Sequence, residues 1–251
     1  MFQIIPEDLY RRLKKHLEYV FTLPAVIANM ENMRPLWVAI ALLLLNEDTI
    51  STFGGAKNLD GYLTERAKLE GKQVHGVERL EEQCSLLNGM DTDMDIFVLN
   101  ETLSEQERLR KGIVKESTFQ KLLDGYRQGN IDPKLLSPIS LSTKNASSGL
   151  ALKIEEYFQT NLIEKRNKKM AARIIDLLKE NPDAYFFAFG LSHFIGEDNI
   201  PDMIRSAGFQ VEEVYEQVTP SATADGVFPK PKPTSIMIFC LIVGLTSAFQ
   251  Y

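Results

Sequence analysis

Residues 185–193 combine an aromatic run, a glycine and a histidine at a spacing that could serve chemistry. Tyr185 to Phe189 is aromatic at four of five positions, and so short an apolar run predicts a buried strand. Gly190 allows a tight bend at its end, and His193 follows three residues later. A neutral imidazole in the loop after a strand is suited to bind a metal ion or to transfer a proton. A histidine that merely hydrogen-bonds within its loop would have the same spacing.

The chain contains two other histidines, and neither has a partner at the spacing of a zinc motif. His16 lies in a cationic helical segment, which predicts a solvated position. His75 lies in residues 72–77, a predicted short strand, where packing or an edge position is expected. His193 is therefore the histidine best placed to bind a metal ion or to transfer a proton, and a structural role in its loop stays open.

Two carboxylates follow the strand predicted at 72–77. Glu78 comes directly after it, and Glu82 lies four residues further on, so both lie on one face of a predicted helix at 78–87. A carboxylate there can bind a metal ion or act as a general base. A charged helix N-terminus stabilised by the helix dipole explains the same residues. Arg166 also has two interpretations: a solvated helix face, or a buried guanidinium that reaches these carboxylates.

The composition is that of an ordinary globular protein, with 251 residues of which 44% are hydrophobic and 25% charged. The net charge of −6 does not indicate a nucleic-acid-binding surface. Cys84 and Cys240 are not expected to pair, so the cysteines do not indicate a cellular compartment.

The order of the predicted elements indicates an α/β or α+β fold with a helical excess, in which helices flank a small mixed sheet. Three strands are predicted, at 72–77, 185–189 and 210–215. The predicted helices are more numerous. They cover residues 6–20, 35–45, 59–70, 78–87, 93–111, 116–128, 150–180 with a break near 160–161, and 200–207.

The C-terminal residues have the composition of a membrane anchor. Ile236 to Phe249 is uncharged and largely apolar, and a proline-rich spacer at 219–234 precedes it. Small residues, a polar spacer and an apolar tail are typical of a glycolipid-anchor signal. A helix that spans a membrane needs about 20 apolar residues, and this stretch is shorter. We expect residues 1–218 to form the folded domain and residues 235–251 to be a membrane tail, single-pass or lipid-anchored. The alternative, an intracellular α/β protein, requires the tail to pack on the domain as a terminal strand or helix.

The N-terminal residues do not read as a signal peptide, because the predicted helix 6–20 follows almost at once. A protein anchored at the extracellular face needs such a peptide, so either the tail is inserted after translation or the full-length product begins further upstream, and we expect the second. Asn100 and Asn145 each begin an Asn-x-Ser/Thr triplet and are candidate glycosylation sites.

Four segments, in the same order, resemble the TIKI branch of the TraB-like metalloprotease family. The resemblance covers nearly the whole chain before the spacer. The segments are an early helix at 6–20, a carboxylate motif at 76–84 followed by Leu-Asn-Gly at 87–89, an Arg-Asn helix at 162–167, and a Gly-x-x-His motif at 186–196 with a closing strand at 208–212.

This resemblance implies a secreted or membrane-anchored protease that depends on a divalent metal, usually manganese or cobalt. Its substrates would be Wnt proteins, cleaved near their N-termini so that Wnt signalling is inhibited. The resemblance implies His193 as a metal ligand and Glu78 as a ligand or the general base. Glu82 and Arg166 would support the ligands or the transition state, and the sequence does not rank Glu78 above Glu82.

One motif of the family is missing from this sequence. The family has another Gly-x-x-His motif upstream of the early helix, whereas neither His16 nor His75 follows a glycine by three residues. We expect the sheet to expose an edge and the metal site to lose a ligand. Two functions stay open: a TIKI-type protease, truncated and poorly active in this form, and a non-catalytic binding protein that retains the fold.

Overall fold

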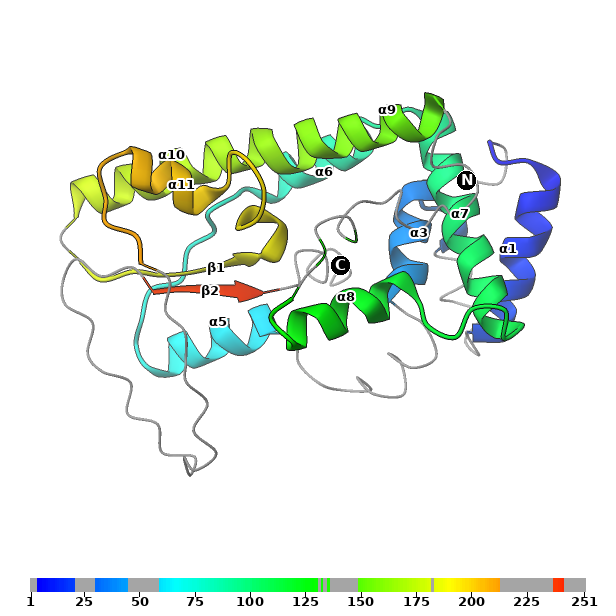
Figure 1. The fold of residues 1–251 in the computed structure, drawn as a ribbon, viewed down its shortest axis with the longest axis horizontal. Helices are drawn as coiled ribbons and strands as arrows, with labels where there is room; N and C mark the ends of the chain where they lie inside the picture. Colours follow the sequence, from blue (N-terminus) through cyan, green and yellow to red (C-terminus); the bar gives the residue numbers. More distant parts are fainter. Residues whose placement is uncertain are drawn as a thin grey trace. The chain divides into compact units, whose positions relative to one another are not determined.

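The computed structural model describes residues 4–20, 30–44, 59–130, 132, 135, 149–181, 183–212 and 237–241, and most of them are helical (Figure 1). The chain divides into two compact units. Unit 1 comprises Met1–Lys57 and Arg79–Leu162, and unit 2 comprises Asn58–Glu78 and Ile163–Tyr251. The predicted helical excess is confirmed.

Unit 1 is a helical unit in which α7 is the central element, since α1, α3 and α9 all contact it. α3 is apolar at every position, and Leu36, Val38 and Leu42 are almost completely buried, as predicted for a buried helix at 35–45. The described helices of this unit are α1 (Glu7–Val20), α3 (Pro35–Leu44), α6 (Leu80–Asn88), α7 (Thr92–Arg110), α8 (Thr118–Arg127) and α9 (Gly149–Tyr157).

The prediction that His16 is solvated is wrong. Leu9, Leu13 and His16 lie on one face of α1 at helical spacing, and this face is buried, so the His16 side chain is only 5% exposed. Burial lowers the pKa of His16 to about 4; the nearby Arg110 adds to the decrease, while Glu107 opposes it. His16 is therefore a neutral, buried residue of the contact between α1 and α7.

Arg12 is the main polar link between α1 and α7. Its Nε and Nη2 donate to Glu107 Oε1 and Oε2 at 3.0 Å each, and two further bonds reach Asn100 Oδ1 at 2.8 Å and Ser104 Oγ at 2.9 Å. The two parallel bonds to one carboxylate have the bidentate geometry that makes arginine pairs strong. Arg12 therefore fixes the register of α1 on α7.

We expect Arg12→Met to lower the free energy of unfolding by about 2 kcal/mol, because it removes charge-assisted hydrogen bonds that are partly shielded from water. Urea denaturation followed by circular dichroism measures the change. Arg11→Met is the matched control: Arg11 is exposed and lies 4.0 Å from Glu7 in the same helix, so we expect a loss below about 0.5 kcal/mol. Equal losses in the two variants would contradict the role given to Arg12.

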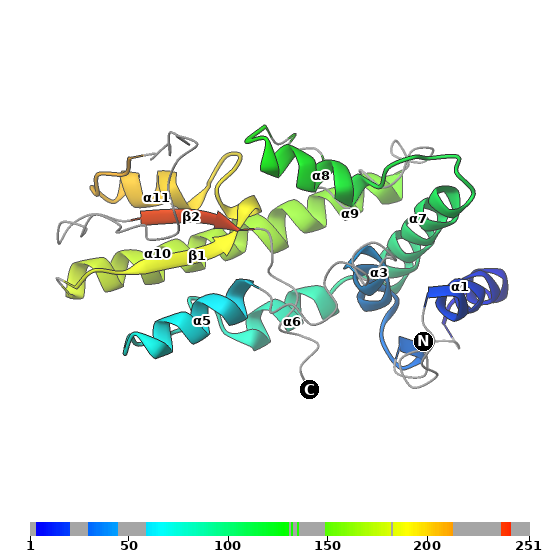
Figure 2. The ribbon, with the colours of Figure 1, turned by 90° about the horizontal axis from the view of Figure 1, so that it is seen from below.

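Unit 2 is built around an apolar core that α10, β1 and α11 share. The buried residues of this core are Met170, Ala171, Ile174, Phe187, Phe189, Ile200 and Ile204. Figure 2 shows β1 and β2 side by side, with α10 and α11 next to them. The elements among the described residues of this unit are α5 (Leu59–Leu69), α10 (Lys165–Glu180), β1 (Phe186–Gly190), the short 3₁₀ helix η4 (Leu191–His193), α11 (Ile200–Ser206) and β2 (Met237–Leu241). The π-helical segment η3 (Phe158–Glu164) precedes α10, and the boundary between the units falls within it.

The described strands form one parallel pair, so the prediction of a mixed sheet is not supported. β1 lies within one residue of its predicted position. Residues 72–77 are irregular, and the strand predicted there is wrong; Val74 is 44% exposed, so the segment does not bury the alternate face that a strand requires. Residues 210–212 are not in a strand either, and residues 213–215 lie outside the described residues.

Part of the predicted membrane tail pairs with the domain. β2 lies parallel to β1, with Phe186 opposite Met237 and Gly190 opposite Leu241. This arrangement is the alternative considered for the tail, a terminal strand. Within the described part of the chain, no helix combines the length and the apolar character that a membrane crossing needs. The spacer at 219–234 and the rest of 235–251 lie outside the described residues, so the membrane tail stays a prediction.

Candidate active site

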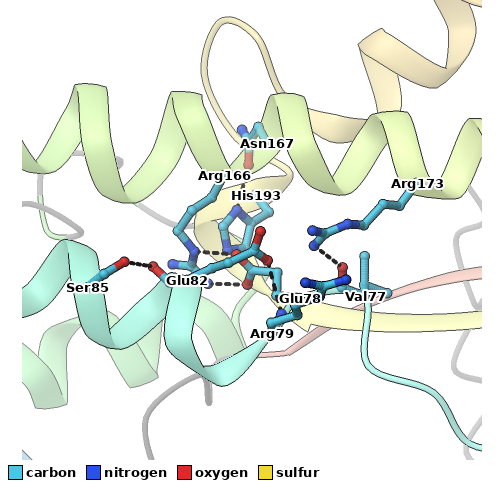
Figure 3. A network of polar contacts seen from close by, with 9 residues as sticks. All are labelled: Val77, Glu78, Arg79, Glu82, Ser85, Arg166, Asn167, Arg173 and His193. Carbon is cyan, nitrogen blue, oxygen red and sulfur yellow. Dashed lines mark hydrogen bonds and ion pairs between the residues drawn. The ribbon is translucent and has the colours of Figure 1, made fainter.

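Four polar side chains of unit 2 gather where β1 ends and α10 begins (Figure 3). His193 is the last residue of η4, directly after β1, and is 3% exposed. Arg166 and Asn167 lie in the first turn of α10. Glu78 ends the irregular segment that follows α5. Figure 3 draws His193 and Glu78 in one polar network, and the charge of Glu78 acts on the pKa of His193, so the structure brings together the two residues predicted as metal ligands.

Glu78 and Arg166 form a bidentate ion pair that is largely removed from water. The Nε atom of Arg166 donates to Oε1 of Glu78 at 2.8 Å, and Nη2 donates to Oε2 at 2.7 Å. The side chains are 9% and 17% exposed, with Glu78 the more buried. Of the two interpretations of Arg166 from sequence, the structure shows the buried guanidinium that reaches a carboxylate. Arg166 thereby neutralises Glu78 and fixes the orientation of its two oxygens.

His193 is neutral at pH 7. Its pKa is lowered to about 4, mainly by burial and also by the charge of Arg166, while Glu78 opposes the decrease. Its Nδ1 lies 2.5 Å from Oδ1 of Asn167, which is completely buried. A neutral imidazole can bind a divalent metal or accept a proton through its other nitrogen.

Two features of the backbone place Glu78. The Nη1 atom of Arg173, on α10, donates to the carbonyl oxygen of Val77 at 2.8 Å, and the Val77 side chain packs against the unit 2 core. A side chain at Gly76 would bring a Cβ to 2.9 Å from the carbonyl oxygen of Glu78, closer than real Cβ atoms approach. The backbone before Glu78 therefore makes a turn that needs glycine at position 76, and the hydrogen bond from Arg173 to the Val77 carbonyl fixes its position.

Sequence reasoning missed Asn167 and Arg173 as residues of this cluster. Asn167 lies on the buried face of α10, three and four residues before Met170 and Ala171. A polar residue on an apolar helix face is a signal that it has a buried partner. Arg173 lies seven residues after Arg166 and thus on the same face of α10, a spacing that the sequence shows.

Glu82 belongs to unit 1, at the start of α6. Its Oε2 accepts a hydrogen bond from the backbone nitrogen of Arg79 at 3.0 Å, the contact that a glutamate makes at the third position of a helix. This is the stabilising role that the sequence left open for the carboxylates at this helix N-terminus. A catalytic role for Glu82 stays a prediction.

We expect Glu82→Ala to lower the free energy of unfolding by about 1 kcal/mol, because a backbone N–H at the helix N-terminus loses its acceptor. Glu82→Gln keeps an accepting oxygen and should retain most of the stability. The exposed neighbour Glu81 is the control: it shares the helix dipole, and Glu81→Ala should cost below about 0.5 kcal/mol. Chemical denaturation of the three variants checks this. An equal loss for Glu81→Ala and Glu82→Ala would exclude a specific role for the hydrogen bond.

The other predicted site residues lie elsewhere or are not described. His75 is exposed, and its Nε2 is 3.3 Å from Oε1 of Gln73. Asn100 lies within α7, partly buried, and its side-chain oxygen accepts the hydrogen bond from Arg12. Asn145 lies outside the described residues. Glycosylation of Asn100 and Asn145 stays a prediction.

The cluster has ligands of the types that a divalent metal prefers, but too few of them. His193 and Glu78 offer an imidazole nitrogen and a carboxylate, the donor types of protease metal sites, which use three protein ligands. Among the described residues, no group of three or more His, Cys, Asp or Glu side chains could hold a metal ion. The described residues thus supply two of the ligands that such a site needs.

Comparisons with known proteins agree with the resemblance seen in the sequence. A family model described as the TraB/PrgY/gumN family matches residues 1–213. Metalloprotease TIKI2 of Xenopus tropicalis is 36% identical to this chain, over 92% of the chain and 49% of the relative. Metalloprotease TIKI1 of Homo sapiens is 35% identical, over 83% of the chain and 47% of the relative. A Metalloprotease TIKI homolog of Nematostella vectensis is 34% identical, over 88% of the chain and 54% of the relative.

The chain thus spans about half the length of the curated relatives that it matches. No solved structure matches it. The names of the relatives indicate proteases that use a divalent metal. Because the family match extends over most of the chain and the relatives share about a third of its residues, this chain belongs to the TraB/PrgY/gumN family, within its TIKI branch.

Proposed function

We propose that this chain supplies part of the active site of a divalent-metal-dependent protease of the TIKI type. The observation that carries the proposal is the meeting of a buried neutral imidazole, His193, with a buried carboxylate, Glu78, in one cluster. A bound divalent metal would supply an activated water and a polarised peptide carbonyl. The family membership of the chain supports this class of chemistry.

The residues of the chain have distinct roles in this proposal. His193 contributes Nε2 as a metal ligand, since its Nδ1 already bonds to Asn167. Glu78 serves as a second ligand or as the general base that accepts a proton from water. Arg166 holds the Glu78 carboxylate in place and balances its charge. The ligands that complete the metal site come from outside the described residues.

The finer identity of the protease follows from the resemblance. We propose Mn²⁺ or Co²⁺ as the metal and a Wnt protein, cleaved near its N-terminus, as the substrate, so that the protease inhibits Wnt signalling. The protein would act at the extracellular face of the cell membrane, held there by residues 235–251 as a transmembrane or lipid-linked tail, which requires residues 237–241 to leave their pairing with β1. It would be a glycoprotein modified at Asn100 or Asn145.

Peptide hydrolysis tests the proposed activity. The chain is stripped of metal, supplied with Mn²⁺ and mixed with a peptide from the N-terminal segment of a Wnt protein, and mass spectrometry detects the products. Because the chain supplies only part of the proposed metal site, we expect slow cleavage, which stops when a chelator is added and which His193→Ala abolishes. His75→Ala replaces an exposed histidine and should leave the rate unchanged. Cleavage that survives the chelator or His193→Ala would refute the proposed site.

A non-catalytic binding protein is the second candidate, and one observation favours it. Both oxygens of Glu78 already bond to Arg166, and the described residues provide no third ligand. Isothermal titration with Mn²⁺ separates the two functions. A protease site should bind one ion, with affinity lost in His193→Ala, whereas a binding protein should take up no ion that depends on His193.

A further inference from the structure

A chain of hydrogen bonds leads from the backbone of Asp198 through Asn167 to His193. We infer that Asn167 is a positioning residue that keeps the proton of the neutral His193 ring on Nδ1 and leaves the lone pair on Nε2. The inference deepens the proposed function and rests on it, because Nε2 is the nitrogen that the proposed site uses. It assigns a role to a residue whose part in the cluster the sequence did not show.

The direction of each hydrogen bond follows from the chemistry of its partners. The carbonyl oxygen of Asp198 can only accept, so the Asn167 atom that lies 2.9 Å from it must be the NH₂ group. This contact settles which way the amide of Asn167 points. The amide oxygen then faces Nδ1 of His193 at 2.5 Å. An amide oxygen also only accepts, so Nδ1 must carry the proton, and a neutral ring has no second one.

The backbone around Asp198 holds the accepting carbonyl in place. Asp198 has a φ of 53° and is the one non-glycine residue with positive φ among those described; aspartate tolerates this left-handed conformation better than most residues. The next residue, Asn199, caps α11: its Oδ1 accepts from the backbone nitrogen of Asp202 at 2.9 Å, and its Nδ2 donates to the carbonyl of Gly196 at 2.8 Å. Both sides of the turn are therefore anchored.

Asn167 is equally well held at the other end. It lies on α10, is completely buried, and has one bond from each half of its amide. A rotation of this amide would place its NH₂ group against a protonated Nδ1 and its oxygen against a carbonyl, so both bonds would be lost. Glu78 is the group in the cluster that would attract a proton to Nε2 of His193. Its two oxygens already accept hydrogen bonds from Arg166, which weakens this competition.

Nitrogen NMR of the metal-free chain measures the tautomer directly. The chain has three histidines, so long-range ¹H–¹⁵N correlation spectra of ¹⁵N-labelled protein at pH 7 show three rings, and His193→Gln assigns the signal. We expect the Nδ1 shift of His193 to be that of a protonated nitrogen and the Nε2 shift that of a lone pair. A ring protonated on Nε2, or an even mixture of tautomers, would overturn the inference.

Variants of Asn167 show whether it imposes this tautomer. Asn167→Asp keeps an oxygen that accepts from Nδ1, so the tautomer should stay, whereas Asn167→Leu removes the acceptor and should release the proton to Nε2. Asn161→Leu is the matched control: Asn161 donates to the carbonyl of Tyr157 in unit 1, and its loss should leave the His193 shifts unchanged. A lost tautomer in Asn167→Asp, or a retained one in Asn167→Leu, would overturn the inference. If Asn167→Leu does not fold, Asn167→Ala removes the same acceptor and takes its place.

A second pair of variants isolates the backbone of Asp198 from its side chain. Asp198→Gly keeps the positive φ and the carbonyl but removes the exposed ion pair with Lys168, whose charged atoms are 3.3 Å apart. Lys168→Met removes the same ion pair and leaves residue 198 unchanged. We expect both variants to retain the Nδ1 proton on His193, and a changed tautomer in either would mean that the carbonyl alone does not set it.

Metal affinity gives a readout in the setting of the proposed function. If the chain binds Mn²⁺ through Nε2, Asn167→Leu should weaken binding by about 10- to 100-fold, as expected when a group that orients a histidine ligand is removed. Unchanged affinity in Asn167→Leu would count against the positioning role. The tautomer is measured without metal or substrate, so a chain that cleaves no peptide can still show it, and failure of one proposal is separable from failure of the other.

Discussion

Arg166→Met is expected to lower the free energy of unfolding by about 3–5 kcal/mol. The substitution takes the guanidinium away from Glu78, a carboxylate that is 9% exposed, and a charge left in so dry a position is costly. Methionine fills similar space and retains the apolar packing of the arginine stem. Urea denaturation of the metal-free chain, followed by circular dichroism, measures the loss.

Two further variants show that the loss comes from the buried charge. Arg66→Met breaks the pair between Arg66 and Glu70 in the same unit, whose side chains are 63% and 43% exposed, and should cost below about 1 kcal/mol. The double variant Glu78→Gln/Arg166→Met removes both charges and should recover much of the stability that Arg166→Met loses. If Arg166→Met costs no more than Arg66→Met, the pair is not buried in solution.

Acidification from pH 6.5 to 4 is expected to destabilise the chain by several kcal/mol through His16 and His193. Both have a pKa of about 4 in the folded protein, whereas the ordinary pKa of histidine is 6.5. Within this window the unfolded chain binds more protons than the folded one, so stability falls as the pH falls and the loss is complete below about pH 4. The difference corresponds to about 3 kcal/mol for each histidine.

Denaturation curves recorded between pH 7 and pH 4 measure this dependence. His16→Gln in unit 1 and His193→Gln in unit 2 should each reduce the slope of the free energy of unfolding against pH by the contribution of the histidine that is replaced. His75→Gln replaces an exposed histidine and should leave the slope unchanged. If the pH slope of the chain survives in both His16→Gln and His193→Gln, the two rings are not the source of the acid sensitivity.

The elements near the site could be predicted where the sequence pattern is local. The aromatic run before Gly190 indicated β1, and the helix predicted at 150–180 corresponds to α9, η3 and α10. His16 could not be placed from composition, because the charged residues around it hid the helical phase that it shares with Leu9 and Leu13. Residues 72–77 read as a strand by composition, yet the described residues hold no partner strand for them.

The contacts of the site could be predicted only in part. The sequence left Arg166 with two interpretations, because the choice depends on burial next to Glu78, which is 88 residues away in the chain. Spacing identifies which residues share a helix face, but it does not show which distant segment covers that face. Asn167 was open to prediction as a polar residue on an apolar face, whereas its link to the Asp198 carbonyl depends on a backbone conformation that no sequence motif announces.

The guanidinium of Arg173 bonds to the main-chain carbonyl of Val77 and not to its side chain. This contact limits which sequence changes the family can accept near the site. Position 77 can accept other apolar amino acids, since every one of them offers the same carbonyl oxygen. The length of the linker after α5 is more strictly limited. Deleting one residue between 72 and 77 would place a different carbonyl next to the guanidinium of Arg173 and would move Glu78 away from His193. Homologous chains with an intact site should therefore keep the glycine at position 76 and show substitutions at other positions of this linker, but neither insertions nor deletions.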